Sequence, residues 1–289
     1  MRDAGLAAVA LIGLAAAPLS AQEPDWYEVT ARRQTDGVRA LKADIHYAVG
    51  ELKVFPAREG LLYDTRLRYD AGRFEPDRSW SVVDDVGTLR LGFAGRGEGV
   101  DWKAWREVGD DDLGFLSVGL GRDVVTELTV EIGAAIGRLD LGGIPLSRLE
   151  YKTGASETEI AFAELNPVRM EEMELAAGAA EFHASGLGNA RFDRLAFEGA
   201  VGEITLDFTG AWDGDATASI SVGLGGLELR LPRDLGVRVR KSGLLASFDS
   251  EGFTKVDDAF QTSNWDSARH RLDIELNTVL GAIDVEFVR

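Results

Sequence analysis

The amino-acid sequence predicts an all-β protein, built as a solenoid-like, β-helix-like stack of short strands with rungs of 21–23 residues. Three observations lead to this fold class: a short motif that recurs, a nearly fixed interval between apolar strands, and glycines that the strands separate from one another. A sequence period of about 20–50 residues is typical of stacked arrays, because a single rung cannot bury its own apolar face.

The recurring motif is an aliphatic residue, a glycine, any residue, and two apolar residues separated by one position. Its six copies span residues 49–54, 86–91, 136–141, 201–206, 224–229 and 280–285. In the fourth copy, Ile204 and Leu206 alternate with Glu203 and Thr205. Since successive strand residues point to opposite faces, each rung should have an apolar interior and an acidic, solvated exterior. The glycines are expected at the rung corners, where tight or positive-φ backbone favours them.

The period is most regular after Val124. The first apolar residue of each second strand recurs at intervals of 21, 22, 22 and 23 residues, at Leu139, Ile160, Phe182, Ile204 and Leu227. A glycine should end the preceding strand of the same rungs, at Gly133, Gly154, Gly178, Gly199 and Gly223. These two series define a predicted inward ladder and a predicted corner.

Two sections follow from this pattern: an N-terminal β section over residues 22–123 and a C-terminal repetitive β-stack over residues 124–289. In the first section, alternating stretches at 27–31, 38–47 and 89–93 are expected to be strands. An irregular insert at 95–121 should form an ordered loop or a short helix at the seam, and almost no helix is expected elsewhere. In the second section, residues 272–276 and 283–287 predict two strands that close the chain.

Residues 1–21 have the features of a secretory signal peptide. Arg2 supplies a positive start, and residues 6–17 are an apolar run too short for a membrane span of about 20 residues. Leu19-Ser20-Ala21 offers small residues for cleavage. We therefore expect export, cleavage near Ala21, and a periplasmic or secreted mature chain. An uncleaved anchor is the alternative, which Pro18 disfavours.

The formal net charge of −18 disfavours nucleic acid and anionic lipid headgroups as partners, because both require clustered Lys and Arg. We expect the chain to be peripheral to a membrane at most. The sequence contains no cysteine, which excludes disulfides, thiol chemistry and a lipidated cysteine.

Motifs for catalysis or cofactor binding are missing from the sequence. His46, His183 and His270 are too far apart to form a local zinc pattern, and neither a nucleophile elbow nor a phosphate-binding glycine loop occurs. The acidic turns Asp110-Asp111-Asp112 and Asp213-Gly214-Asp215 could bind Ca²⁺, but neither has the spacing of a calcium loop, so solvated turns are preferred. We expect no catalytic residue, no cofactor and no metal.

Two groups of side chains are candidates for partner binding. Trp102 and Trp105 lie in the irregular insert; exposed, they could stack on sugar rings or anchor a partner, and buried, they would cap the apolar stack. Arg238, Arg240 and Lys241 belong to a local basic cluster that could face water or meet an acidic partner.

The stretch 199–210, followed by Trp212 and by residues 231–237, resembles the toast-rack β proteins. These are related to the C-terminal domain of cell-wall-active-antibiotic response proteins and to adhesin-like domains of unknown function. Residues 44–69 are similar to the N-terminal toast-rack domain, and residues 253–287 are similar to the end of those domains. The resemblance implies a rack or helix-like pile of strands and brings no catalytic residues. Envelope-stress members carry transmembrane helices before this domain, whereas a signal peptide argues against a membrane-anchored signalling role.

These observations favour a non-enzymatic, exported cell-envelope protein, a β-stack scaffold or binding module that is adhesin-like or related to envelope stress. Its partner would be an envelope protein or a glycan. Two alternatives remain open: a carbohydrate-active enzyme on a β-helix, suggested by fold-level analogy, and an adhesin subunit that forms homo-oligomers through open sheet edges.

Overall fold

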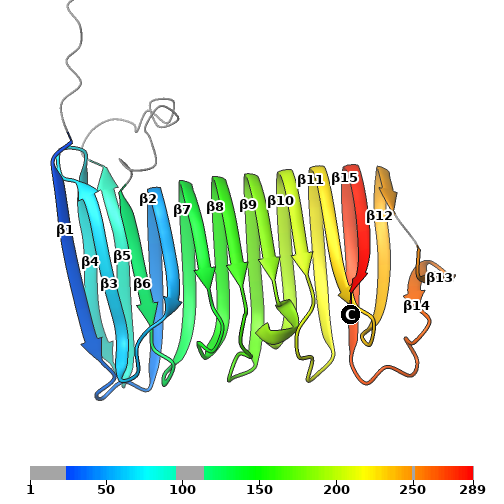
Figure 1. Cartoon of the computed structure of the whole chain (residues 1–289), viewed down its shortest axis with the longest axis horizontal. Helices are drawn as coiled ribbons and strands as arrows, with labels where there is room; N and C mark the ends of the chain where they lie inside the picture. Colours follow the sequence, from blue (N-terminus) through cyan, green and yellow to red (C-terminus); the bar gives the residue numbers. More distant parts are fainter. Residues whose placement is uncertain (1–23, 96–113, 249–250, 289) are drawn as a thin grey trace, which may run out of the picture.

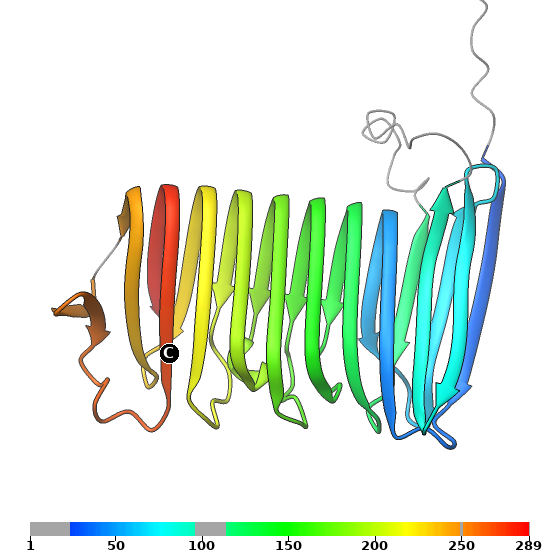
Figure 2. The same ribbon diagram turned by 180° about the vertical axis from the view of Figure 1, so that it is seen from behind.

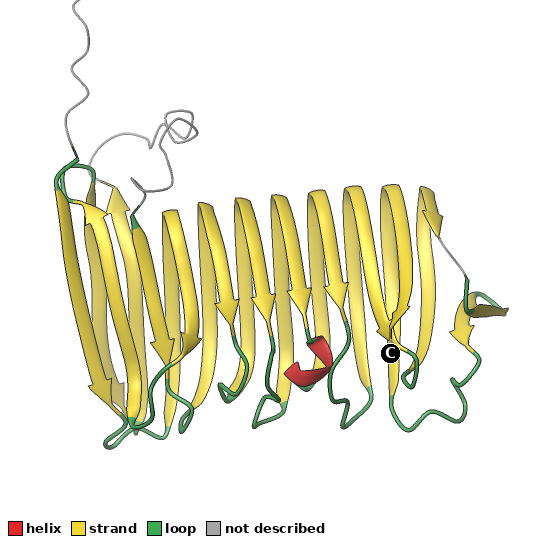
Figure 3. Ribbon diagram, viewed as in Figure 1, coloured by secondary structure: helices red, strands yellow, loops and turns green. Residues whose placement is uncertain are grey.

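The computed structural model describes residues 24–95, 114–248 and 251–288. These residues form one mixed β-sheet of 15 strands, drawn out into a long rack (Figure 1). Within the described ranges, helix is confined to the four-residue 3₁₀ turn η2, Leu187–Ala190 (Figure 3). The predicted all-β stack is therefore confirmed.

The strands fall into three groups along the chain. The N-terminal group comprises β1 (Trp26–Gln34), β2 (Ala40–Pro56), β3 (Leu61–Asp70), β4 (Phe74–Val83), β5 (Val86–Gly95) and β6 (Phe115–Leu120). The long strands that follow are β7 (Val125–Asp140), β8 (Leu146–Ala161), β9 (Met170–Ser185), β10 (Phe192–Asp207), β11 (Ala216–Pro232) and β12 (Gly236–Phe248). The chain then forms β13 (Phe253–Val256), β14 (Ala259–Thr262) and β15 (Arg271–Val288).

Each long strand is a complete rung of the rack. It rises along one face, bends over at the upper edge of the molecule, and descends along the opposite face (Figure 1 and, from behind, Figure 2). Neighbouring rungs pair in parallel on both sides of the bend, as β10 and β11 do from Arg194 to Asp207. The sequence suggested two short strands per rung, whereas the structure has one continuous strand with a bend.

Glycine is required at four of the bends, whereas β7, β8 and β9 have Ala135, Ser156 and Ala180 at the equivalent position. Gly50, Gly202, Gly225 and Gly281 have φ between 126° and 153°, a region that L side chains rarely adopt. A Cβ atom at Gly225 would also lie 1.9 Å from the carbonyl oxygen of Gly202 on the neighbouring rung. Four of the six motif copies therefore mark bends, as predicted.

The other two motif copies have a different position, so their assignment to corners was wrong. Gly87 lies in the β4–β5 hairpin, opposite Val82. The two residues that connect this hairpin, Asp84 and Asp85, have φ of 50° and 62°, as in a type I′ turn. Gly137 pairs with Leu52, two residues beyond the bend glycine of β2.

The predicted inward ladder holds, with one change of register. Ile160 pairs with Ala184, and Phe182 pairs with Thr158, so the interval between β8 and β9 is 24 residues rather than 22. Because the difference is two residues, both Ile160 and Phe182 still point inward, and both are buried. Ile204 is also buried, which confirms the predicted facing of the motif.

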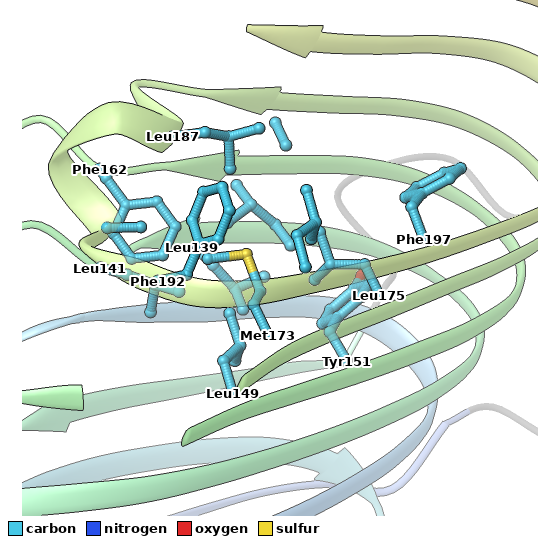
Figure 4. Close-up of a cluster of buried hydrophobic side chains, with 14 of the residues drawn as sticks. Leu139, Leu141, Leu149, Tyr151, Phe162, Met173, Leu175, Leu187, Phe192 and Phe197 are labelled. Atoms are coloured by element: carbon cyan, nitrogen blue, oxygen red, sulfur yellow. The ribbon is translucent and has the colours of Figure 1, made fainter. Parts of the chain in front are cut away.

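The two faces of the rack enclose a single apolar core (Figure 4). The rings of Tyr151 and Phe182 lie 6.1 Å apart, and those of Phe182 and Phe197 lie 5.2 Å apart. Tyr151 and Phe197 precede the bends of their rungs, whereas Phe182 follows its bend. The aromatic contacts therefore join one face to the other, and the core stabilises the whole length of the rack.

The two ends of the rack depart from the simple repeat. At the N-terminal end, β2 pairs with β5 before its bend and with β6 after it, and β4, β3 and β1 extend these two faces in antiparallel pairing. At the C-terminal end, β15 lies between β11 and β12, out of chain order. The antiparallel strands β14 and β13 follow beyond β12.

Asn166 holds three successive turns together at the lower edge of the rack. Its side chain is fully buried. Its Nδ2 donates to the carbonyl oxygens of Leu146 at 2.8 Å and Ala190 at 3.0 Å, and its Oδ1 accepts from the amide of Leu146 at 3.1 Å. The amide side chain thus satisfies backbone groups that a loop between rungs would otherwise leave buried without partners.

We expect Asn166→Ala to lower the free energy of unfolding by about 2–4 kcal/mol, since several buried backbone groups would lose their partners. Urea denaturation followed by circular dichroism measures this change. Asn277→Ala, at an exposed strand position, is the matched control and should change stability little. Equal losses in the two variants would show that Asn166 does not stabilise the turns.

Candidate interaction surfaces

The tryptophans predicted to bind a partner, Trp102 and Trp105, lie outside the described residues, and so does the acidic turn at residues 110–112. The same holds for most of the insert, for which a loop or short helix was expected. The chain leaves the described part of the structure at Gly95, the end of β5, and returns just before β6.

The basic cluster is placed on β12, where it meets acids of this same chain. The Nε of Arg238 donates to Asp273 at 3.1 Å, and Arg240 lies 3.1 Å from Asp273 and 3.6 Å from Glu275. The guanidinium of Arg238 also stacks over Trp265 at 4.6 Å. The hydrogen bond with Asp273, together with the charge of that carboxylate, raises the pKa of Arg238.

These acidic partners can be identified from the sequence only if the order of the strands in the sheet is already known. The β12–β15 register pairs Arg238 with Asp273 and Arg240 with Glu275, so two alternating patterns of opposite charge face each other. The separation of 35 residues along the chain conceals this pairing. Lys241 follows on the same strand, beside Leu276 of β15.

The acidic turn Asp213-Gly214-Asp215 holds arginines. Asp213 accepts hydrogen bonds from Arg169 at 3.3 Å and from Arg191 at 2.7 Å, one on each carboxylate oxygen. The backbone amide of Arg271 donates to Asp215 at 2.9 Å. Within the described ranges, no group of three or more His, Asp or Glu side chains is arranged to hold a metal ion.

We therefore expect EDTA to leave the melting temperature unchanged, because the carboxylate of Asp213 already has Arg169 and Arg191 as partners. Thermal unfolding with and without the chelator, followed by re-addition of Ca²⁺, is the measurement. A fall of several degrees that Ca²⁺ reverses would contradict the prediction.

An uncharged strip follows the bends along the upper edge of the rack. Its first row consists of Ala134, Ala155, Ala179, Val201, Leu224 and Leu280, which pair side by side on β7, β8, β9, β10, β11 and β15. The row beside it consists of Gly133, Gly154, Gly178, Ala200, Gly223 and Val279. At the usual strand spacing of about 4.8 Å, six rungs span about 24 Å. We call these two rows the apolar ridge.

The largest side chains of the apolar ridge project into solvent. Val201 is 50% exposed, Leu224 44%, Val279 58% and Leu280 47%. They lie next to one another on three neighbouring rungs, whereas the ridge on β7–β9 carries alanine and glycine. A contiguous exposed apolar patch is unusual on a soluble protein and marks interaction surfaces.

Acidic side chains border the ridge on both sides. Glu157, Glu181 and Glu203 are exposed neighbours on β8, β9 and β10, one residue beyond the bend glycine position. Glu198 lies on the other side, in a shallow hollow of ≈ 430 Å³ that is otherwise lined mostly by Ala, Gly and Ser. Among the described residues, no basic side chain forms an ion pair with these four carboxylates.

The ridge was not predicted from the sequence, although the recurring motif contains its aliphatic residues. Val201, Leu224 and Leu280 are the aliphatic residues that precede the bend glycines. At a bend, two consecutive residues can both point outward, so strict alternation assigns one of them to the wrong face. The alternation rule thus identified the core and overlooked the exposed apolar row.

A separate cavity of ≈ 270 Å³ lies at the N-terminal end, between the two antiparallel extensions. Leu67, Leu91 and Phe93 form apolar parts of its wall, and Asp77 and Arg78 contribute charged groups.

A family model described as the N-terminal domain of toast_rack matches residues 21–183, which is more than half of the chain. Among solved structures, a candidate cell adhesion protein from Clostridium sporogenes is 16% identical, with a TM-score of 0.50; the match covers 91% of this chain and 100% of that one. A candidate adhesin from Bacteroides fragilis is 12% identical, with coverages of 90% and 97% and a TM-score of 0.29. At 16% identity, the likeness to the Clostridium sporogenes protein concerns the fold alone.

No curated protein matches this chain. In the described part of the chain, none of the helical structure has the length and hydropathy that a membrane-spanning helix requires.

Proposed function

Because the chain belongs to the family described as the N-terminal domain of toast_rack, we propose that it is an exported, non-enzymatic binding protein of the cell envelope, adhesin-like in its role. The observation that carries this proposal is the apolar ridge. A chain with a net charge of −18 exposes an uncharged strip across six rungs, with four aliphatic side chains projecting from it. Such a surface is suited to binding another molecule.

Oligomerisation through sheet edges has less support. In the described part of the sheet, β1 forms one outer edge, and it carries Glu28, Arg32 and Arg33. Charged side chains on an edge strand are a common means of preventing edge-to-edge pairing. The ridge, by contrast, carries no charge in either of its rows.

The test of the binding role compares one double variant and one single variant of the full chain. Leu224→Ser with Leu280→Ser removes apolar side chains from the ridge, whereas Val83→Ser removes a more exposed one from β4, at the other end of the rack. Each protein is produced in the cells from which it derives, and the fraction retained on washed envelopes is measured. Retention should fall for the ridge variant and stay unchanged for Val83→Ser. Equal retention of both variants would contradict the proposed role of the ridge.

Export has its own test. We expect the mature chain to begin near Gln22, since the apolar run at 6–17 and the small residues at 19–21 have the form of a cleaved signal. N-terminal sequencing of the protein recovered from the envelope fraction measures the start. An intact Met1 on that protein would be incompatible with cleavage.

A further inference from the structure

We propose that the apolar ridge binds a polypeptide that presents aliphatic side chains together with Lys or Arg. The inference rests on the proposed binding role and names the chemistry of the partner. The surface supplies two kinds of contact in fixed positions: the aliphatic side chains of the ridge on β10, β11 and β15, and an acidic border beside the ridge, formed by Glu157, Glu181 and Glu203 on β8–β10.

The acidic border argues for a basic partner. Glu157, Glu181 and Glu203 are direct neighbours on parallel strands, so their like charges repel one another in the isolated chain. Some other outward carboxylates after the bends do have cations: Glu51 forms ion pairs with Lys53 and Arg138, and Glu228 forms one with Arg230. The sequence thus leaves the carboxylates without cations at the ridge, where a partner's ammonium or guanidinium groups would relieve the repulsion.

The hollow beside the ridge has the shape for a long basic side chain. Its small residues, such as Ala177 and Ala200, leave room for an alkyl stem, and Glu198 lies in the same hollow to receive the charged end. Lys and Arg commonly pack their stems on apolar surface while the charged group remains at a polar site. The partner's aliphatic side chains would meanwhile pack between Val201 and Leu224.

The same border disfavours the other occupants of an apolar surface. Anionic lipid headgroups would be repelled by the four carboxylates. A second copy of the chain would bring an identical acidic border against the first, with a net charge of −18 on each copy. A polypeptide with apolar and basic side chains can pack against the ridge and also form ion pairs with the carboxylates beside it.

The probe is a fluorescently labelled 14-residue peptide of alternating Lys and Leu, with an alternating Glu and Leu peptide as its matched control. Fluorescence anisotropy with the full mature chain should show binding of the Lys peptide and not of the Glu peptide. Leu224→Ser with Leu280→Ser should weaken binding at least about tenfold, because two aliphatic contacts are lost. Glu181→Gln with Glu203→Gln should also weaken binding and should flatten its dependence on salt.

Each contrary result has a distinct meaning. Equal binding of both peptides, or unchanged affinity and salt dependence in the Glu variant, would overturn the inferred partner chemistry while leaving the envelope-retention result of the ridge variant standing. Ridge-dependent binding to phosphatidylcholine vesicles without peptide binding would identify a lipid surface instead. Ridge-dependent dimers in sedimentation experiments would identify a second copy. The Val83→Ser variant should bind the Lys peptide as tightly as the original chain.

Discussion

Gly225→Ala should destabilise the protein by more than about 4 kcal/mol, or prevent folding, because two penalties coincide at this position. Its φ of 132° is rarely adopted by L residues. The new Cβ would also lie 1.9 Å from the carbonyl oxygen of Gly202, and a paired backbone cannot move away without breaking the ladder. Urea denaturation, or the yield of folded protein if the variant fails to fold, measures the effect.

Substitutions at two other glycines distinguish the penalty of the backbone conformation from the penalty of the steric clash. At Gly37, with φ of 73°, a Cβ would meet no atom within 4 Å, so Gly37→Ala should show the backbone penalty alone, about 1–2 kcal/mol. At Gly226, the neighbouring residue, a Cβ would meet the end of the flexible Glu203 side chain, which can turn aside. A loss at Gly225 no greater than that at Gly226 would show that close approach between the rungs does not limit this site.

Ile204→Asp should destabilise the protein by more than about 4 kcal/mol, since a carboxylate would be buried without a partner and apolar contacts would be lost. Ile204 is 3% exposed and pairs with Phe182 and Leu227 on the adjacent rungs. Thr205→Asp, one residue away on the outer face, should cost about 0.5–1 kcal/mol, part of it from repulsion by Glu228.

Chemical denaturation of both variants makes the comparison, and Thr205→Asn removes the charge effect from the control. The Oγ1 of Thr205 lies 3.5 Å from Glu228, so Thr205→Asn should be milder than Thr205→Asp. A larger loss at Thr205 than at Ile204 would mean that the strand is shifted by one residue and that the assigned faces are reversed.

The parts of the fold that depend on local rules could be predicted from the sequence. The period of two along a strand placed Ile204 and Leu206 in the core, and both are buried. The need for positive φ at a bend explains why Gly202 and Gly225 are glycines. The offset between β8 and β9 escaped prediction because a shift of two residues preserves the inward facing of Ile160.

The features that depend on neighbours distant in the chain could not be predicted. Arg238 contacts Asp273 because β15 lies beside β12, and no periodic pattern in the sequence indicates that strand order. Val201 is exposed because a bend interrupts the alternation that a straight strand would have. The acidic border of the ridge becomes visible once the register aligns Glu157, Glu181 and Glu203.

The position of β15 makes the order of synthesis differ from the order in space. β12 is made before β15, yet β15 lies between β11 and β12. Until β15 has been synthesised, β12 must either stay apart from β11 or pair with it in an arrangement that β15 later displaces. A chain that stops before Arg271 is therefore not a shorter version of the rack, as it would be in a linear repeat array, because it lacks an interior rung. The C-terminal end of the rack can thus form only after β15 has been synthesised.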